Sequence, residues 1–273
     1  MVRPVIAAIG GLALLVALVV PNATASTSNG RTRHYDAGGL DSCNAPTHPQ
    51  MAAFWHQTRW WWWGVYIGGI NRACPNTNLT ARWVRREVRR GWGLQPIWVG
   101  LQAPCVSQSG LARISYHRSR AHQQGRQAAR SAYAAVQRLD LNTPAPVVYD
   151  MEAFNTGNQK CVAAVKAFVR GWSYQLRAKS GLVPGYYGSS CASADSEMWT
   201  INPRPSYLWG ANYRRSAKVS RMSCVQPNIW PRRLKQYSGG SRVTENGVTL
   251  SVDKDCANGP VYGPRRHDLN DCT

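Results

Sequence analysis

The chain has few acidic residues and almost no phenylalanine. It has 13 Asp+Glu against 33 Lys+Arg, and 3 Phe against 12 Trp and 12 Tyr, in 273 residues with a formal net charge of +20. It has no collagen repeat, heptad run or long block of like charge, which excludes fibrous and coiled-coil proteins and a charged disordered tail. Since 44% of its residues are hydrophobic and its 8 Cys are sparse, we expect a globular protein built on a real core.

The motifs that hold metals and nucleotides are also missing. The sequence contains no C-x-x-C or H-E-x-x-H pattern, no Walker loop, and no G-x-G-x-x-G after its first predicted strand. We therefore expect no metal site, no nucleotide cofactor and no other cofactor.

The N-terminus resembles a secretory signal. Arg3 precedes the apolar run 5–20, which ends at Pro21 and is followed by the small-residue site 23–25. A membrane anchor is the alternative, but the run is shorter than the roughly 18 residues that a spanning helix needs. We expect a signal peptide over 1–25, an N-terminal extension over 26–36 and one domain over 37–273. The lack of a twin Arg favours the general export route, so the protein would be secreted or wall-associated, with no membrane span after cleavage.

Eight short apolar segments, several of them continuous, are typical of buried parallel strands. They cover residues 38–41, 64–68, 95–100, 145–149, 182–187, 206–212, 234–237 and 248–252. Amphipathic or small-residue patterns predict helices over 79–90, 119–139 and 161–179, and later helices look short. This alternation predicts an α/β fold: a single-domain, TIM-like (β/α)8 barrel, somewhat irregular. A doubly wound open sheet fits the same alternation but lacks its usual nucleotide motif.

Export favours disulfides, although the sequence leaves their pairing open. The candidates are Cys43, Cys74, Cys105, Cys161, Cys191, Cys224, Cys256 and Cys272. Five of them (43, 74, 105, 191 and 256) fall shortly after predicted strands. We therefore hypothesise that disulfides rigidify the loops at the catalytic face of the barrel; general stapling of surface loops is the alternative.

Four of the scarce carboxylates, Asp41, Asp150, Glu152 and Asp253, fall at the ends of predicted strands. In a barrel, such positions favour catalysis. Asp150 and Glu152 are two apart, so they share one face of a strand, and repulsion between them would raise the pKa of one. An acid beside an anion is what splitting a glycosidic bond requires. A structural salt-bridged pair is the alternative, since basic residues abound.

Two interpretations of the aromatic and amide side chains near the predicted strand ends have equal weight: they line a groove, or they pack in the core. These side chains are Tyr149, Tyr187, Trp209, Tyr213, Gln236 and Tyr237.

Several segments carry a family resemblance, among them GGLDSCNAP, GWGLQPIWVGLQAPC, VVYDMEAF and GYYGS. Over residues 38–255 the chain resembles the exported actinobacterial glycoside hydrolase-like family known as domain of unknown function 1906. That family in turn resembles the Chalaropsis-type lysozymes of glycoside hydrolase family 25, which are barrels that cleave peptidoglycan between N-acetylmuramic acid and N-acetylglucosamine.

The resemblance implies roles for individual residues. Glu152 would be the general acid, Asp150 would orient the substrate's acetamido group or stabilise charge, and Asp41 and Asp253 would line the cleft. A W-Q-Y motif of the lysozymes appears here as residues 235–237, with Lys in place of Trp, and Leu40 stands where Phe is usual.

We therefore expect a monomeric, secreted hydrolase of a β-linked amino-sugar polymer, a peptidoglycan muramidase in type, whose partner is a cell-wall glycan or other anionic polysaccharide. The first alternative is a non-catalytic barrel that binds wall glycan. The second is an exported nucleic-acid or anionic-lipid binder, which is disfavoured because the Arg residues are spread along the chain and no nucleic-acid-binding motif is present.

Overall fold

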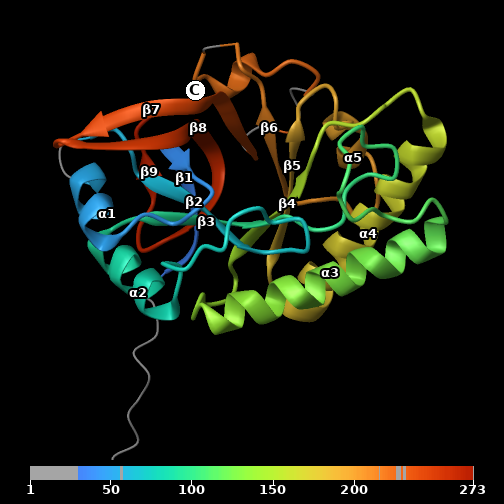
Figure 1. Cartoon of the computed structure of the whole chain (residues 1–273), viewed down its shortest axis with the longest axis horizontal. Coiled ribbons are helices and arrows are strands. Elements are labelled where there is room, and N and C mark those ends of the chain that lie inside the picture. The colour runs from blue at the N-terminus through green and yellow to red at the C-terminus, as the bar shows by residue number, and fades with distance from the viewer. Residues whose placement is uncertain (1–29, 56–57, 215, 226–228, 230–231, 273) are drawn as a thin grey trace, which may run out of the picture.

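The computed structural model describes residues 30–55, 58–214, 216–225, 229 and 232–272 (Figure 1). Its strands close into one barrel with helices packed outside it. The expected signal peptide lies outside the described residues. The first strand begins at Arg31, so the last residues of the expected N-terminal extension belong to the barrel.

All eight predicted strands are present. The strands are β1 Arg31–Asp41, β2 Trp62–Gly68, β3 Gly93–Trp98, β4 Pro146–Met151, β5 Val183–Ser189, β6 Tyr207–Ala211, β7 Arg233–Glu245, β8 Val248–Gly263 and the short β9 His267–Asp268. Strands β1 to β7 pair in sequence order and parallel to one another. Strand β8 closes the barrel between β7 and β1. The TIM-like barrel is thus confirmed as a closed, mixed eight-stranded sheet in a single domain.

The eighth strand departs from the regular barrel, because β8 runs antiparallel to both of its neighbours. Asn246 and Gly247, both at positive φ (47° and 79°), make the turn between β7 and β8. A two-residue turn of this kind joins antiparallel strands, whereas a parallel pair needs a crossover of a dozen or more residues. Since β8 enters the barrel from the opposite end, its early residues lie beside the late residues of β1.

The helices are α1 His48–Trp55, α2 Ala81–Arg90, α3 Arg118–Arg138, α4 Gln159–Ser180 and α5 Asp195–Trp199, with a 3-10 turn, η1, at Val219–Arg221. The three predicted helices are confirmed as α2, α3 and α4. Among the described residues, full-length helices cover the first half of the barrel only, which is the irregularity that the sequence predicts.

Helices α3 and α4 lie side by side along the barrel (Figure 1). A Cβ atom on Gly125 would lie 2.0 Å from the Phe168 carbonyl oxygen, and one on Gly171 would lie 2.1 Å from the His122 carbonyl oxygen. Glycine in the middle of a helix costs about 1 kcal/mol relative to alanine. These two glycines are therefore explained by the close crossing of the two backbones.

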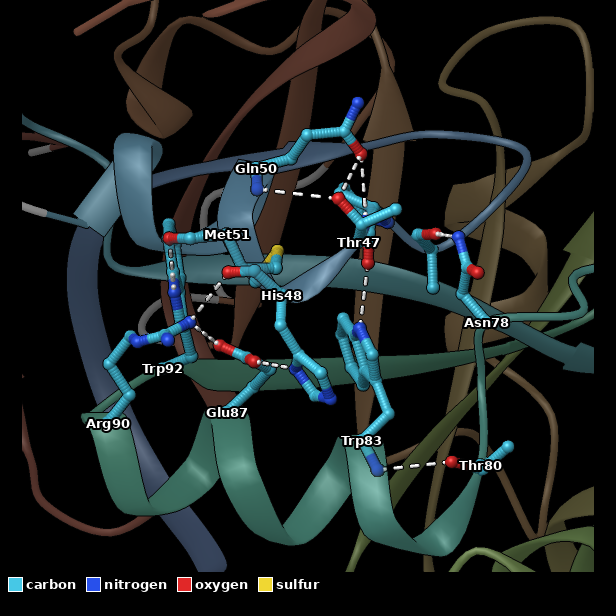
Figure 2. Close-up of polar contacts among 12 residues, drawn as sticks. Thr47, His48, Gln50, Met51, Asn78, Thr80, Trp83, Glu87, Arg90 and Trp92 are labelled. Carbon is cyan, nitrogen blue, oxygen red and sulfur yellow. Dashed lines mark hydrogen bonds and ion pairs between the residues drawn. The ribbon is translucent and has the colours of Figure 1, made fainter.

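Helix α2 is tied to α1 by a buried ion network, shown in Figure 2. The fully buried Glu87 carboxylate contacts both His48 and Arg90. At the N-terminus of α2, the Thr80 hydroxyl accepts a hydrogen bond from the Trp83 amide at 3.1 Å, and the Trp83 indole donates to the Pro46 carbonyl at 2.7 Å. The loop that follows the end of β1 is thereby fixed to the outer helices.

All eight cysteines form disulfides, paired 43–74, 105–161, 191–224 and 256–272. The first three join the connections that follow β1 and β2, β3 and β4, and β5 and β6, all at the C-terminal ends of parallel strands. We expected Cys256 to follow a strand. It lies within β8 instead, because β8 continues to Gly263. Three of the four disulfides thus lie where the catalytic-face hypothesis puts them.

In the described part of the chain, no helix combines the length and apolar character that a membrane crossing requires.

Candidate active site

The predicted carboxylates lie at one end of the barrel. Asp41 ends β1 and is the register partner of Asp253 on β8. Asp150 is the next-to-last residue of β4, and Glu152 directly follows that strand. The antiparallel β8 explains how Asp253, early in its strand, comes to lie beside a strand end.

Gln236 links two of these acids. Its Nε2 donates to Oδ2 of Asp41 at 2.8 Å and to Oδ2 of Asp253 at 3.1 Å. Its Oε1 accepts from the hydroxyls of Tyr187 at 2.8 Å and Tyr213 at 2.7 Å. These contacts fix the orientation of the amide, so that its N–H groups face the two carboxylates without neutralising them. The structure thus brings together Asp41, Asp253, Gln236 and Tyr187.

Asp41 is the centre of the network. The Tyr66 hydroxyl donates to its Oδ1 at 3.1 Å, and Asp255 is hydrogen-bonded to it as well. Burial and the charge of Asp253 raise the pKa of Asp41 to about 6, against the hydrogen bonds from Gln236, Asp255 and Tyr66 that lower it. Asp41 is therefore ionised at neutral pH.

Asp255 is a second buried acid of this network. Burial, reinforced by the charge of Asp41, raises the pKa of Asp255 well above its usual range. The Trp209 indole donates to Oδ1 of Asp255 at 3.2 Å. Trp209 itself is 1% exposed, so it holds this acid from beneath the open surface.

Asp150 is a third buried acid at this end of the barrel. It is buried, and its Oδ1 atom has no hydrogen-bond partner among the described residues. Burial first, and then the charges of Glu152 and Asp41, raise the pKa of Asp150 well above its ordinary value. The i, i+2 spacing thus places Asp150, a buried carboxyl with a raised pKa, beside the exposed carboxyl of Glu152.

Gln102 clamps the backbone of this acidic pair. Its Oε1 accepts from the Glu152 amide at 2.8 Å, and its Nε2 donates to the Asp150 carbonyl at 2.9 Å. Glu152 projects from this clamp as an exposed side chain.

A pocket of about 230 Å³ opens over the acidic pair. It is lined by Cys43, Tyr66, Asn71, Ala73, Val99, Gln102, Gln108, Leu111, Asp150 and Glu152. A buried acid with a raised pKa and an exposed carboxyl thus face the same cavity, an arrangement suited to proton transfer at a bound polar substrate.

Residues 235 and 237 face away from this site, because neighbouring residues of a strand point to opposite sides of the sheet. Tyr237 packs against Val219 and the Cys256–Cys272 disulfide. Lys235 is fully buried, and its Nζ donates to the carbonyls of Lys218 at 3.3 Å and Arg221 at 2.9 Å. The position at which the lysozyme motif carries Trp thus holds a buried cation.

Three site residues were not predicted: Tyr66, Gln102 and Asp255. Asp255 had the clearest signal, since it lies two residues after Asp253 as Glu152 does after Asp150; it was missed because the predicted strand ended at residue 252. Tyr66 and Gln102 are identified only by the register of strands and loops.

Among the described residues, no group of three or more His, Cys, Asp and Glu side chains is arranged to hold a metal ion.

Several solved structures are similar to this chain. An uncharacterized protein of B. stearothermophilus is 20% identical, with 81% of this chain and 95% of that chain covered at a TM-score of 0.54. The Tat-secreted protein Rv2525c of Mycobacterium tuberculosis, crystallised with L-tartrate, is 16% identical, with the same shares covered at a TM-score of 0.56. A muramidase of Acremonium alcalophilum is 15% identical over 82% of this chain and 94% of that chain, at a TM-score of 0.47.

A search of the curated proteins finds no match. The family model of the Rv2525c-like, glycoside hydrolase-like domain, in contrast, matches residues 54–257, which include most of the barrel and three of the four predicted acids. The chain therefore belongs to the Rv2525c-like family of glycoside hydrolase-like domains.

Proposed function

We propose that the protein is a secreted hydrolase that cleaves a β-linked amino-sugar polymer of the cell wall, in the manner of a peptidoglycan muramidase. The observation that carries the proposal is the pairing of a buried Asp150, whose pKa is raised, with an exposed Glu152 in one pocket. Membership of a glycoside hydrolase-like family supports it.

In this proposal, Glu152 is the general acid. It gives its proton to the glycosidic oxygen as the bond from that oxygen to the anomeric carbon breaks, and water then supplies the hydroxyl at that carbon and returns a proton to the protein. Because Glu152 is exposed at the mouth of the pocket, its carboxyl can reach a polymer lying across the opening.

Asp150 has a different role, because it is buried and keeps its proton. A neutral carboxyl donates a hydrogen bond, which suits the carbonyl oxygen of an acetamido group. Its side chain lines the pocket that would hold the substrate.

Asp41 supplies the negative charge that the reaction needs. Positive charge develops on the sugar ring in the transition state, and a fixed anion in a poorly hydrated site stabilises it. Since the pKa of Asp41 is raised to about 6, this anion is present at neutral pH and disappears below pH 6. We therefore expect hydrolysis to weaken as the pH falls through about 6.

Secretion and wall binding belong to the same proposal. Four disulfides suit an oxidising compartment outside the cytosol, and the excess of Lys and Arg over Asp and Glu would concentrate the protein on anionic cell walls. We propose that the secreted form is a monomer.

The test compares the wild type with Glu152→Gln on purified cell-wall sacculi, with release of reducing ends as the readout. Glu197→Gln, at a partly exposed glutamate that lies outside the pocket and pairs with Lys166, is the matched control. We expect release by the wild type and by the control, and a loss of about hundredfold or more in Glu152→Gln. If no variant releases reducing ends while all of them bind sacculi, the protein is a glycan-binding barrel and not a hydrolase.

A further inference from the structure

The opposite end of the barrel carries a groove that the carboxylate site does not use. Two pockets, of about 630 and 440 Å³, adjoin there and share Ser206 and Arg232 in their linings. They lie where the chain enters β5, β6 and β7 and beside the first residues of β1, at the N-terminal ends of these strands.

The lining of the groove is basic. Arg33, Arg177, Arg204 and Arg232 line it, and none of the lining residues is acidic. Asp268 contacts the lining at one edge, where its carboxylate lies 3.3 Å from His34 and also pairs with Arg266. The charge of the four arginines is therefore not balanced within the groove.

The arginines also crowd one another. Burial, and then the charges of Arg204 and Arg232, lower the pKa of Arg177. Like charges held together in this way cost folding free energy, and an anion bound among them would offset that cost.

Two of these side chains are held in place before any ligand binds. Arg177 Nη2 donates to the Arg204 carbonyl at 2.8 Å and to the Ser206 hydroxyl at 2.9 Å. The other N–H groups of the Arg177 guanidinium have no partner among the described residues. The Arg204 guanidinium lies 4.3 Å from the ring centroid of Trp199. At the far end of the groove, Nε of Arg33 is buried with no hydrogen-bond partner in the described part of the chain.

The chemistry of the lining favours phosphate groups. Guanidinium groups bind phosphate through paired hydrogen bonds, and Ser206, Thr200 and Asn202 add neutral hydrogen-bonding groups. Two adjoining pockets of this size exceed the volume of one phosphate, so the groove suits a chain that carries several.

The lining does not suit nucleic acid. Proteins that bind single strands stack the bases on exposed aromatic rings. The lining holds two aromatic rings. Trp199 is 6% exposed and is covered by Arg204, and the His34 imidazole is held by contacts of its two nitrogens with Asp268 and Asn258. The groove therefore favours a polymer whose phosphodiesters join small, flexible units that need no stacking surface.

We propose that this arginine groove binds a polymer of phosphodiester-linked polyol or sugar units, on the face of the barrel opposite the carboxylates. This site does not depend on the proposed hydrolase activity. Engagement of such a polymer there would leave the carboxylate pocket open to a glycan.

The test measures the binding of fluorescently labelled poly(glycerol phosphate), which has no glycosidic bond to cleave, by anisotropy at a fixed salt concentration. The site variant is Arg204→Gln with Arg232→Gln. The matched control is Arg82→Gln with Arg86→Gln. It removes two exposed arginines from α2, so it has the same net charge as the site variant. We expect the site variant to bind about tenfold or more weakly, with a shallower salt dependence, and the control to bind as the wild type does.

The variant Glu152→Gln should bind the polymer as tightly as the wild type, which separates this site from the hydrolase proposal. Equal thermal unfolding midpoints in the two double variants would show that folding is not the cause of any difference. Equal weakening in both double variants, or no binding by the wild type, would overturn the proposal. A thymidine oligonucleotide of equal charge provides a further test. If it binds the wild type as tightly as the polymer does, and the site variant loses that binding, the proposal is also overturned.

Discussion

Individual carboxyl groups are held in this protein at a cost in stability. Asp150, Asp195 and Asp255 are buried, and burial is the largest cause that raises the pKa of each. A buried carboxyl that stays neutral contributes less to folding than an apolar side chain of the same size would. At Asp150 and Asp255, the adjoining pocket and carboxylates offer a functional reason for that cost.

Asp195 is the simplest case, because both of its carboxyl oxygens are buried without a partner among the described residues. Its pKa is raised in the folded state from 3.8, so the folded chain keeps a proton that the unfolded chain releases. The free energy of unfolding should therefore fall as the pH rises above about 4. Asp195→Asn should remove this part of the pH dependence and be more stable than the wild type at neutral pH, as measured by chemical unfolding at several pH values.

Glu197→Gln is the control for this measurement, since it lies in the same helix with its side chain 42% exposed. It should follow the pH dependence of the wild type. An unchanged pH dependence in Asp195→Asn would mean that Asp195 is ionised in the folded protein.

Asp150 can be tested as a neutral hydrogen-bond donor. Asparagine places N–H donors at the same position, whereas alanine removes them. Asp150→Asn should therefore keep the release of reducing ends from sacculi to within about tenfold of the wild type, and Asp150→Ala should lose about hundredfold. Equal loss in the two variants would show that Asp150 has to give up its proton or carry a charge.

Helices and strands were largely predictable from the sequence, because buried parallel strands and amphipathic helices leave clear patterns. The direction of β8 was not predicted, although Asn246-Gly247 is a strong signal for a hairpin. For the site, strand-end position was enough to indicate Asp41, Asp150, Glu152 and Asp253. Tyr66 and Gln102, like the disulfide pairing, depend on how strands and loops align in space, and no local pattern records that.

The crossing of α3 and α4 depends on two glycines. Gly125→Ala would place a methyl group against the Phe168 carbonyl, so the helices would have to move apart. Although alanine favours a helix, overpacking of this kind costs about 1–3 kcal/mol or more. Gln127→Ala, an exposed position of the same helix, should be nearly neutral. The free energies of unfolding of the two variants provide the measurement, and equal values would show that the crossing tolerates a wider separation.

The whole molecule is a barrel whose open end is tied by disulfides between neighbouring connections. Cys105–Cys161 and Cys256–Cys272 differ in place and in sequence separation, 56 and 16 residues. By the loop-entropy relation, their removal should lower the free energy of unfolding by about 4 and about 3 kcal/mol.

Their effects on activity should differ more than their effects on stability. The Cys105 connection continues from Gln102, which clamps the backbone of Asp150 and Glu152. The double change Cys105→Ser with Cys161→Ser should therefore reduce glycan hydrolysis at temperatures at which the protein remains folded, and Cys256→Ser with Cys272→Ser should leave it close to wild type. The same activity in both double variants would mean that the clamp does not need the disulfide.

The account depends most on the protonation of Asp150 beside Glu152 in the pocket. Infrared difference spectroscopy between the wild type and Asp150→Asn at neutral pH tests it most directly, because a protonated carboxyl has a C=O stretching band well separated from the bands of a carboxylate. The account predicts a protonated-acid band that is present in the wild type and absent from the variant. A difference spectrum that contains only carboxylate bands would contradict it.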